Sequence, residues 1–383
     1  MANPGSAKRS VEDAVTAEAR PSRHGHARLH PRQTLEAARG NLKKSALELL
    51  GFAAGAYLVL RLIPSLRRAL EDLERLSWEW VLAAIALETL SETGFVVSWR
   101  AIVDPDNLLC REGGRRVDVR AAWAQLGAGT LVPGGSLGGL GVGAWLLHRF
   151  GMPTKLIAER QFNLSFLNTA IDALALIIFG IGLATGLLSG KHDPSLTLLP
   201  AVVAAIGLAA ALLIARRAPA YVKRVRPRHP KLASSIETLA AAVDDTKQLL
   251  VHRGGFKAVL GAQAYLWLDV AVLWIAFVAI HAHPVPTFAV ITLAYIIGAL
   301  GGSLPLPAGL GTIGGMVGML IVFGVAHNPA VAAVVIYQAV GLLVPAAGGA
   351  IAYLLLRHQL GGAIGEPSAD GGEPPAGEPS HAE

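Results

Sequence analysis

The sequence is poor in charged residues, and most of its second half has almost none. Only 16% of its 383 residues are Asp, Glu, Lys or Arg, whereas soluble chains average about 25%. Residues 258–356 contain no Lys or Arg and a single acidic residue, Asp269. A bilayer demands such a stretch, because a charged side chain at its centre costs about 2.5–3.5 kcal/mol on insertion scales. The shortage of charge therefore predicts a membrane protein.

The absence of several sequence motifs limits the cofactors and the kinds of catalysis that can be expected. Cys110 is the only cysteine, so the chain forms no intrachain disulfide and has no paired-cysteine metal site. It contains no Walker A, HExxH or GxSxG sequence. Residues 309–314 fit GxGxxG, but a dinucleotide site also needs an acidic residue about 20 positions later, and none occurs before Glu366. We therefore expect no cofactor, no bound metal and no enzymatic activity.

Apolar segments of about 20 residues predict an all-α polytopic membrane domain over residues 46–357. Six of them are expected to be full spans: 46–64, 76–99, 161–188, 198–215, 259–280 and 330–356. Two more, 121–147 and 287–325, are interrupted by Pro and Gly. Residues 1–45 form a basic arm and residues 358–383 an acidic tail. Both lack apolar runs and are predicted to be disordered.

The distribution of Lys and Arg predicts the orientation. Basic residues concentrate in the arm and in the loop after Ala215, which places both on the cytoplasmic side. Segment 121–147 has basic loops at both ends, so it should start and end inside, whereas 287–325 should start and end outside. These are two oppositely entering re-entrant hairpins, an inverted-repeat-like arrangement. Both termini are predicted to be cytoplasmic, in the plasma membrane.

The interrupted segments supply the first candidate site residues. Backbone that leaves the helix within lipid must be buried in protein or line a wet cavity, so the two breaks are candidates for a substrate pathway. The candidates are Pro133, Gly134, Gly135 and Gly138 in the first segment, and Pro305, Pro307, Gly309 and Gly311 in the second. The alternative is a purely structural break filled by neighbouring helices.

Polar residues within spans supply the remaining candidates. Asp172 and Asp269 lie deep in apolar segments, where ionisable residues are costly and usually pair or serve a pathway. Glu88 and Glu92 are one helical turn apart but rank lower, because Glu92 also fits a position near the membrane surface. Gln338 can line the same pathway or make a helix–helix hydrogen bond.

These residues carry a family resemblance. The Pro133-Gly134-Gly135 cluster, Asp172, the run from Pro305 to Gly311 and Gln338, in this order, resemble the flippase-like transmembrane domain family. This is the membrane domain of lysylphosphatidylglycerol synthases and of stand-alone integral membrane relatives. The resemblance covers about residues 45–357. It implies a polytopic membrane protein that moves or binds a lipid with a polar head group.

The chain departs from the family pattern at charged positions. The resemblance implies Glu where this chain has Gly314, and Arg where it has Gln338 and Thr169. Gly139 stands where the first cluster often ends with an acidic residue. These departures imply a neutral or differently charged lipid, or a lost transport activity. The soluble aminoacyltransferase domain of the synthases is absent, so no lysyl transfer is expected.

The leading hypothesis is a translocase for a lipid, a polyprenyl lipid or another amphiphile. A cavity between the hairpins would admit the head group, with Asp172 and Asp269 binding it or a coupling cation. One alternative is a membrane glycosyltransferase or other lipid-modifying enzyme, with Asp104 and Asp106 as its acidic pair. Another is a structural subunit of a membrane complex. The basic arm predicts anionic lipid at the cytoplasmic face as a partner, and no nucleic acid.

Overall fold

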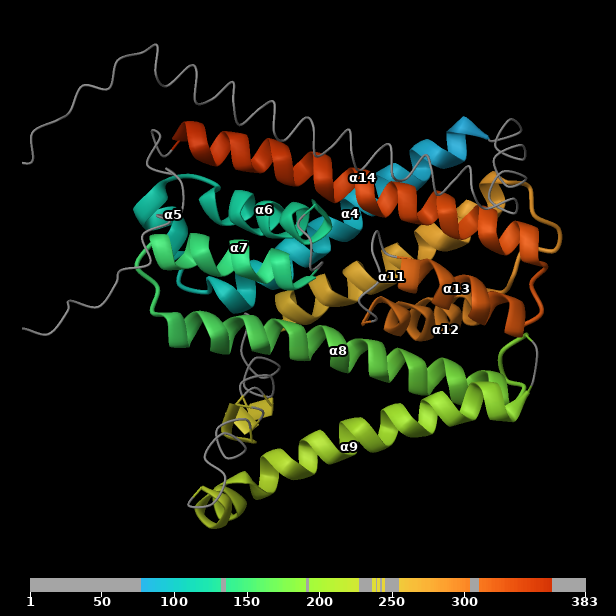
Figure 1. Cartoon of the computed structure of the whole chain (residues 1–383), viewed down its shortest axis with the longest axis horizontal. Helices are drawn as coiled ribbons and strands as arrows, with labels where there is room; N and C mark the ends of the chain where they lie inside the picture. Colours follow the sequence, from blue (N-terminus) through green and yellow to red (C-terminus); the bar gives the residue numbers. More distant parts are fainter. Residues whose placement is uncertain are drawn as a thin grey trace, which may run out of the picture. The chain divides into compact units, whose positions relative to one another are not determined.

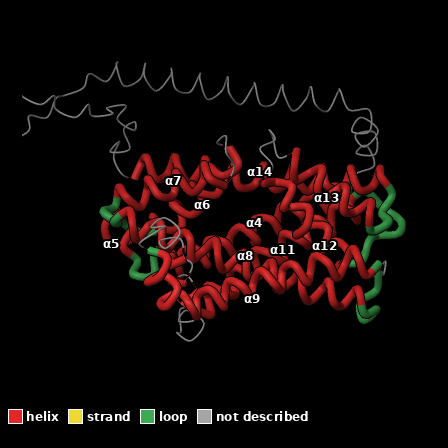
Figure 2. The backbone as a smooth tube through the Cα atoms, turned by 60° about the horizontal axis from the view of Figure 1, so that its bottom comes forward, coloured by secondary structure: helices red, strands yellow, loops and turns green. Residues whose placement is uncertain are grey.

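The computed structural model describes residues 77–131, 136–190, 193–226, 255–303 and 310–359, with a few positions between 236 and 244. Internal contacts divide the chain into two units, Met1–Leu62 and Ile63–Glu383, and every described residue belongs to the second. The described part is helical and contains no strand (Figures 1 and 2). The predicted span 46–64, the basic arm and all but the first two residues of the acidic tail lie outside the described residues.

Five helices are long and apolar enough to cross a bilayer. They are α4 (Trp78–Val103), α8 (Thr154–Ala184), α9 (Pro194–Val225), α11 (Gly255–Ala279) and α14 (His327–Gln359). The shortest has 25 residues, about 37 Å at 1.5 Å per residue, which exceeds a hydrocarbon core of about 30 Å. These helices confirm the five predicted apolar segments that fall within the described residues.

Several helices extend beyond the predicted apolar segments at one end. For example, α8 begins at Thr154 rather than at residue 161, and its first turns contain the Lys155–Glu159 pair with 3.8 Å between nitrogen and oxygen. An apolar sequence identifies only the part of a helix that lies within the bilayer. The backbone hydrogen bonds of the helix continue into the polar residues at its ends. The α8 helix ends at Ala184, Thr185 is its C-cap, and Gly186 follows with a φ of +72°.

The two interrupted segments form pairs of shorter helices. The first pair is α6 (Val117–Leu131) and α7 (Ser136–Arg149), preceded by the short helix α5 (Leu108–Gly113). The second is α12 (Phe288–Ala299) and α13 (Leu310–Val322), with the 3-10 turn η2 (Leu300–Ser303) between them. Helices of each pair pack on each other. The links 132–135 and 304–309 lie outside the described residues.

Glycines let the long helices approach closely. A Cβ built at Gly261 of α11 would lie 2.6 Å from the carbonyl oxygen of Gly94 in α4, so no side chain fits at this crossing. Nearby, the Ser98 hydroxyl donates to the carbonyl of Ala258 at 2.7 Å. Small residues and interhelical hydrogen bonds are the features that hold helices together in lipid. Helices α6 and α14 meet in the same way, at Gly127 and Gly349.

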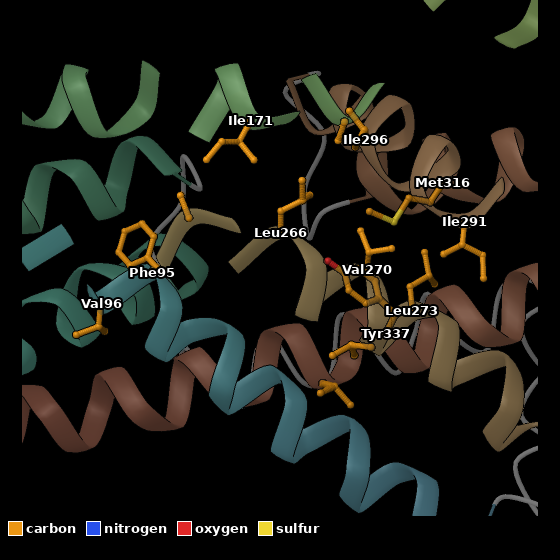
Figure 3. Close-up of a cluster of buried hydrophobic side chains, with 14 of the residues drawn as sticks. Phe95, Val96, Ile171, Leu266, Val270, Leu273, Ile291, Ile296, Met316 and Tyr337 are labelled. Carbon is orange, nitrogen blue, oxygen red and sulfur yellow. The ribbon is translucent and has the colours of Figure 1, made fainter. Parts of the chain in front are cut away.

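The core lies where α4, α8 and α11 meet the second helix pair and α14. Figure 3 shows Val270 and Leu273 of α11 close to Ile291 of α12 and Met316 of α13, and all four side chains are buried. By contrast, α9 packs on α8, and only 11% of its most apolar 18-residue stretch is buried. The outer face of α9 is therefore apolar and exposed, as expected of a helix that faces lipid.

Candidate functional site

A cavity of about 410 Å³ lies among α4, α6, α7, α8, α11 and α14. This volume is within the range of small-molecule sites. The lining residues are Glu88, Glu92, Phe95, Gln125, Leu126, Gly129, Thr130, Gly139, Leu140, Gln161, Leu164, Ser165, Asn168, Tyr265, Asp269, Tyr337, Gln338, Gly341 and Pro345. More than half of them are polar or glycine, and none is Lys, Arg or His. The cavity is thus polar and acidic, although the helices around it are apolar.

The acidic part of the lining is formed by α4 and α11. The carboxyl groups of Glu88, Glu92 and Asp269 are all buried. Asp269 accepts hydrogen bonds on Oδ2 from the hydroxyls of Tyr295 and Tyr337, the latter at 3.2 Å. These two rings stack edge-on at 6.0 Å between centroids. Tyrosines from α12 and α14 therefore hold one oxygen of Asp269 in place.

The other polar part of the lining is a pair of glutamines. Gln125 Oε1 of α6 accepts from Trp99 Nε1 of α4 at 2.8 Å and from Gln161 Nε2 of α8 at 2.8 Å. Because Trp99 is fully buried, its indole N–H needs this acceptor. The glutamine pair fixes α6, the first helix of its pair, against two long helices and so shapes this wall of the cavity.

Pro345 adds a further polar feature on α14. Proline has no N–H, so the carbonyl oxygen of Gly341, four residues earlier, lacks its ordinary helical donor. Both residues line the cavity. The Gly341 carbonyl therefore lacks its helical donor at a position that lines the cavity.

The structure places some of the predicted site residues at the cavity and others away from it. Asp269 and Gln338 line the cavity together. Asp172 is half-buried on α8 and does not belong to the lining, although it lies near enough to Asp269 for their charges to interact. Gly138 is half-buried beside the lining residue Gly139.

The remaining predicted residues belong to the breaks of the two helix pairs. Gly311 is buried against Gly301 in the α12–α13 pair. The other predicted residues of the two breaks lie outside the described residues: Pro133, Gly134, Gly135, Pro305, Pro307 and Gly309.

Several lining residues were missed or ranked low by sequence reasoning. Glu88 and Glu92 ranked below the two aspartates, and Gln125, Gln161 and Asn168 were not considered. The available signal was the presence of amide and carboxyl side chains in otherwise apolar segments. It does not say which side of a helix faces a cavity.

The acidic pair proposed for the enzymatic alternative has structural contacts. Asp104 accepts hydrogen bonds from the backbone N–H groups of Leu108 and Leu109, at 2.7 and 3.1 Å, and so caps α5. Burial raises the pKa of the Asp104 carboxyl, and these two donors oppose the rise. Asp106 pairs with Arg160 at 3.1 Å. Among the residues described, no cluster of His, Cys, Asp or Glu is suited to a metal ion.

A second cavity, of about 430 Å³, lies between the end of α9 and residues 237–244. Its lining is mostly Ala and Val, with the Arg226–Glu237 ion pair at its edge. It gathers no buried polar groups comparable to those around Asp269, so we consider the first cavity the functional candidate.

Comparison with known families agrees with this architecture. The profile described as "Lysylphosphatidylglycerol synthase TM region" matches residues 49–349. The chain belongs to this family. No curated protein and no solved structure was found to match this chain. The family match begins within the predicted span 46–64 and covers every helix around the cavity, including most of α14.

The positions where this member of the lysylphosphatidylglycerol synthase TM region family departs from the expected pattern have different surroundings. Gln338, where an Arg was expected, lines the cavity. Thr169 is exposed and donates to the carbonyl of Ser165 in its own helix at 2.9 Å. Nothing lies within 4 Å of a Cβ built at Gly314, so a side chain fits there. The departures at Gln338 and Gly139 alter the charge of the cavity wall, because both residues line it.

Proposed function

We propose that this protein is a lipid translocase of the plasma membrane. The head group of a lipid, a polyprenyl lipid or a related amphiphile passes through the cavity around Asp269 while the tails stay in the bilayer. The observation that carries the proposal is a cavity of about 410 Å³ that is lined by polar and acidic side chains and lies among apolar helices, four of which are long enough to cross a bilayer. Family membership supports a role in handling membrane lipids.

Helix length supports re-entrant hairpins. The helices α6, α7, α12 and α13 contain 15, 14, 12 and 13 residues. At 1.5 Å per residue each is at most about 22 Å long, which is shorter than a hydrocarbon core of about 30 Å. Each pair therefore enters the membrane and returns to the same side. Broken helices of this kind are tolerated where they line a wet cavity or are buried in protein.

Charge supports opposite sides of entry. Arg115, Arg116 and Arg120 flank the start of α6, and Arg149 ends α7, whereas the loops around α12 and α13 contain no Lys or Arg. By the positive-inside rule the first hairpin enters from the cytoplasm and the second from outside. Both termini are then cytoplasmic, where the basic arm contacts anionic lipid. The contacts of Asp104 and Asp106 favour transport over catalysis.

Filling the cavity tests the proposal. A Cβ at Gly341 would lie 3.6 Å from Glu88 Oε1, an ordinary contact, so the rest of a leucine side chain would extend into the cavity. We expect Gly341→Leu to slow lipid movement about tenfold or more, a rise in the barrier of roughly 1.4 kcal/mol. The matched control is Gly207→Leu on α9, where nothing lies within 4 Å of a Cβ.

The measurement uses purified protein in liposomes that contain fluorescent lipids of several head groups. An outside quencher reports the probe that reaches the outer leaflet. Movement faster than in empty vesicles, slowed by Gly341→Leu and unchanged by Gly207→Leu, supports a translocase that uses this cavity. Absence of movement for every head group, with the protein folded and inserted, would contradict energy-independent lipid movement. Equal rates in both variants would show that lipid takes another route.

A further inference from the structure

Three carboxyl groups meet at the cavity. Glu88 and Glu92 lie one helical turn apart on α4 and are each 4% exposed, and Asp269 on α11 is 6% exposed. All three residues line the cavity. One oxygen of each carboxyl, Oε2 in both glutamates and Oδ1 in Asp269, has no hydrogen-bond partner within the described residues. Buried polar atoms normally have partners, so each of these three oxygens can carry a proton or accept a hydrogen bond.

No basic side chain in the cavity lining balances these acids. The titratable groups that face the cluster are Glu88 and Glu92 from α4, Tyr265 and Asp269 from α11, Tyr295 from α12, Tyr337 from α14 and, at longer range, Asp172 from α8. Helices α6 and α7 contribute no titratable side chain to the lining. Three uncompensated negative charges within a membrane bundle would each be strongly unfavourable. The cluster must therefore bind positive charge.

The contacts indicate which carboxyl carries a proton. Asp269 accepts two tyrosine hydroxyls on Oδ2, which stabilises its ionised form. Glu88 lines the same cavity, and no described group donates a hydrogen bond to its Oε2. Its ionised form therefore lacks the stabilisation that the tyrosines give Asp269, whereas a neutral carboxyl keeps an O–H donor. The geometry thus assigns the negative charge to Asp269 and the proton to Glu88.

A proton fits this cluster better than a metal ion. Within the described part of the chain, no group of three or more His, Cys, Asp or Glu side chains has the arrangement of a metal site. A proton needs only one oxygen, which the Glu88 carboxyl provides. Glu92, four residues further along α4, lies on the same side of the helix as Glu88 and lines the same cavity.

We propose that Glu88, Glu92 and Asp269 form a proton-binding site, and that head-group movement through the cavity is coupled to proton release and uptake there. On release, the Glu88 O–H bond breaks, the proton passes to water and Glu88 becomes a carboxylate. On uptake, a proton from the opposite side restores the O–H bond. The coupling rests on the translocase proposed above, whereas the proton site can be tested without it.

The first measurement detects the proton directly. Infrared difference spectra of the protein in deuterated buffer separate the carbonyl stretch of a protonated carboxyl from that of a carboxylate. We expect a protonated-carboxyl band near neutral pH that disappears as the pH is raised. Glu88→Gln should remove it. The matched control, Glu79→Gln, makes the same change at an exposed position of α4 and should keep it. Absence of the band in the unmodified protein would overturn the proton site.

The second measurement tests coupling. Lipid movement is followed in liposomes with a pH gradient imposed in either direction. We expect the rate to differ severalfold between the two directions for the unmodified protein and for Glu79→Gln. The difference should vanish in Glu88→Gln, with Glu92→Gln as a second variant should Glu88→Gln fail to fold. Lipid movement that ignores the gradient would overturn the coupling and leave the translocase intact. Absence of lipid movement would contradict the translocase itself, and with it the coupling, while the infrared result stands separately.

Discussion

Single glycines decide how closely the helices around the cavity approach one another. At the crossing of α4 and α11, Gly94 and Gly261 bring two backbones into contact, and Ser98 donates across the same crossing. Glu88 and Glu92 lie on α4 and Asp269 on α11, so this contact also sets the distance between the carboxyl groups. A residue that packs helices here thus controls the geometry of the acidic cluster.

Gly261→Ala is expected to destabilise the protein. Its Cβ would lie 2.6 Å from the Gly94 oxygen and 2.7 Å from Ser98 Oγ, so the helices must separate. Overpacking of this kind lowers the free energy of unfolding by about 1–3 kcal/mol. Thermal unfolding in detergent measures the change. Gly207→Ala on α9, where a Cβ meets nothing within 4 Å, should change stability by less than about 0.5 kcal/mol. Equal effects in both variants would show that the crossing does not depend on Gly261.

At the scale of helices, one short pair follows α4 and the other follows α11, with α8, α9 and α11 between the two pairs. The α6–α7 pair packs against α4, α8 and α14, while the α12–α13 pair packs against α8, α11 and α14. Both pairs thus contact α8 and α14. The cavity, however, is lined by α6 and α7 and by no residue of α12 or α13. Tyr295 connects the second pair to the acidic cluster by donating to Asp269.

Thiol labelling tests whether the pairs are re-entrant. Cys110 is first replaced by Ser to give a background without native cysteine. Single cysteines then replace exposed residues at the two ends of each pair: Arg115 and Lys155 for the first, Thr287 and Asn328 for the second. We expect an impermeant reagent to label both ends of the second pair from outside the cell and neither end of the first. This follows because each hairpin returns to its own side.

A full span provides the control for this labelling. Lys155 lies in the first turn of α8 and Thr185 is its C-cap, so Thr185→Cys should be labelled from outside while Lys155→Cys is not. If the two ends of either short pair were labelled from opposite sides, that pair would cross the membrane and the re-entrant topology would be wrong.

At the scale of the whole molecule, the number of spans sets the side of the C-terminus. The described part contains five candidate spans, an odd number, which alone would leave the ends of this part on opposite sides. The apolar segment 46–64 is predicted to add a sixth, and the family match begins inside it, at residue 49. With six spans and two re-entrant pairs, both termini lie on the same side.

Reporter fusions after Gln359 test this count. A fluorescent protein that matures only in the cytoplasm should be bright at this position, and a phosphatase that is active only outside should be inactive. Removing residues 1–64 should disturb this result, because the chain then has an odd number of spans. An active phosphatase fused after Gln359, in the chain that keeps residues 1–64, would mean that 46–64 does not cross the membrane.

The sequence by itself determined the membrane class, the approximate position of each long described helix and of the two interrupted pairs, and the family. These follow from local properties: the mean apolarity of about 20 consecutive residues and the order of the Pro and Gly clusters. Each residue contributes to such properties independently of distant parts of the chain. Boundaries were less accurate, since α8 and α9 continue through basic residues that an apolarity count excludes.

Only the tertiary structure decided which polar residues share a cavity. It joined Glu88 and Glu92, which had ranked low, to Asp269 and Gln338, and it left Asp172 outside the lining. The reason is the direction in which each side chain points around the axis of its helix. A polar residue in a span can face lipid, a neighbouring helix or a cavity, and its direction depends on how helices from distant parts of the chain pack. Contacts such as Gly94 with Gly261 set that packing, and composition or spacing within one segment does not encode it.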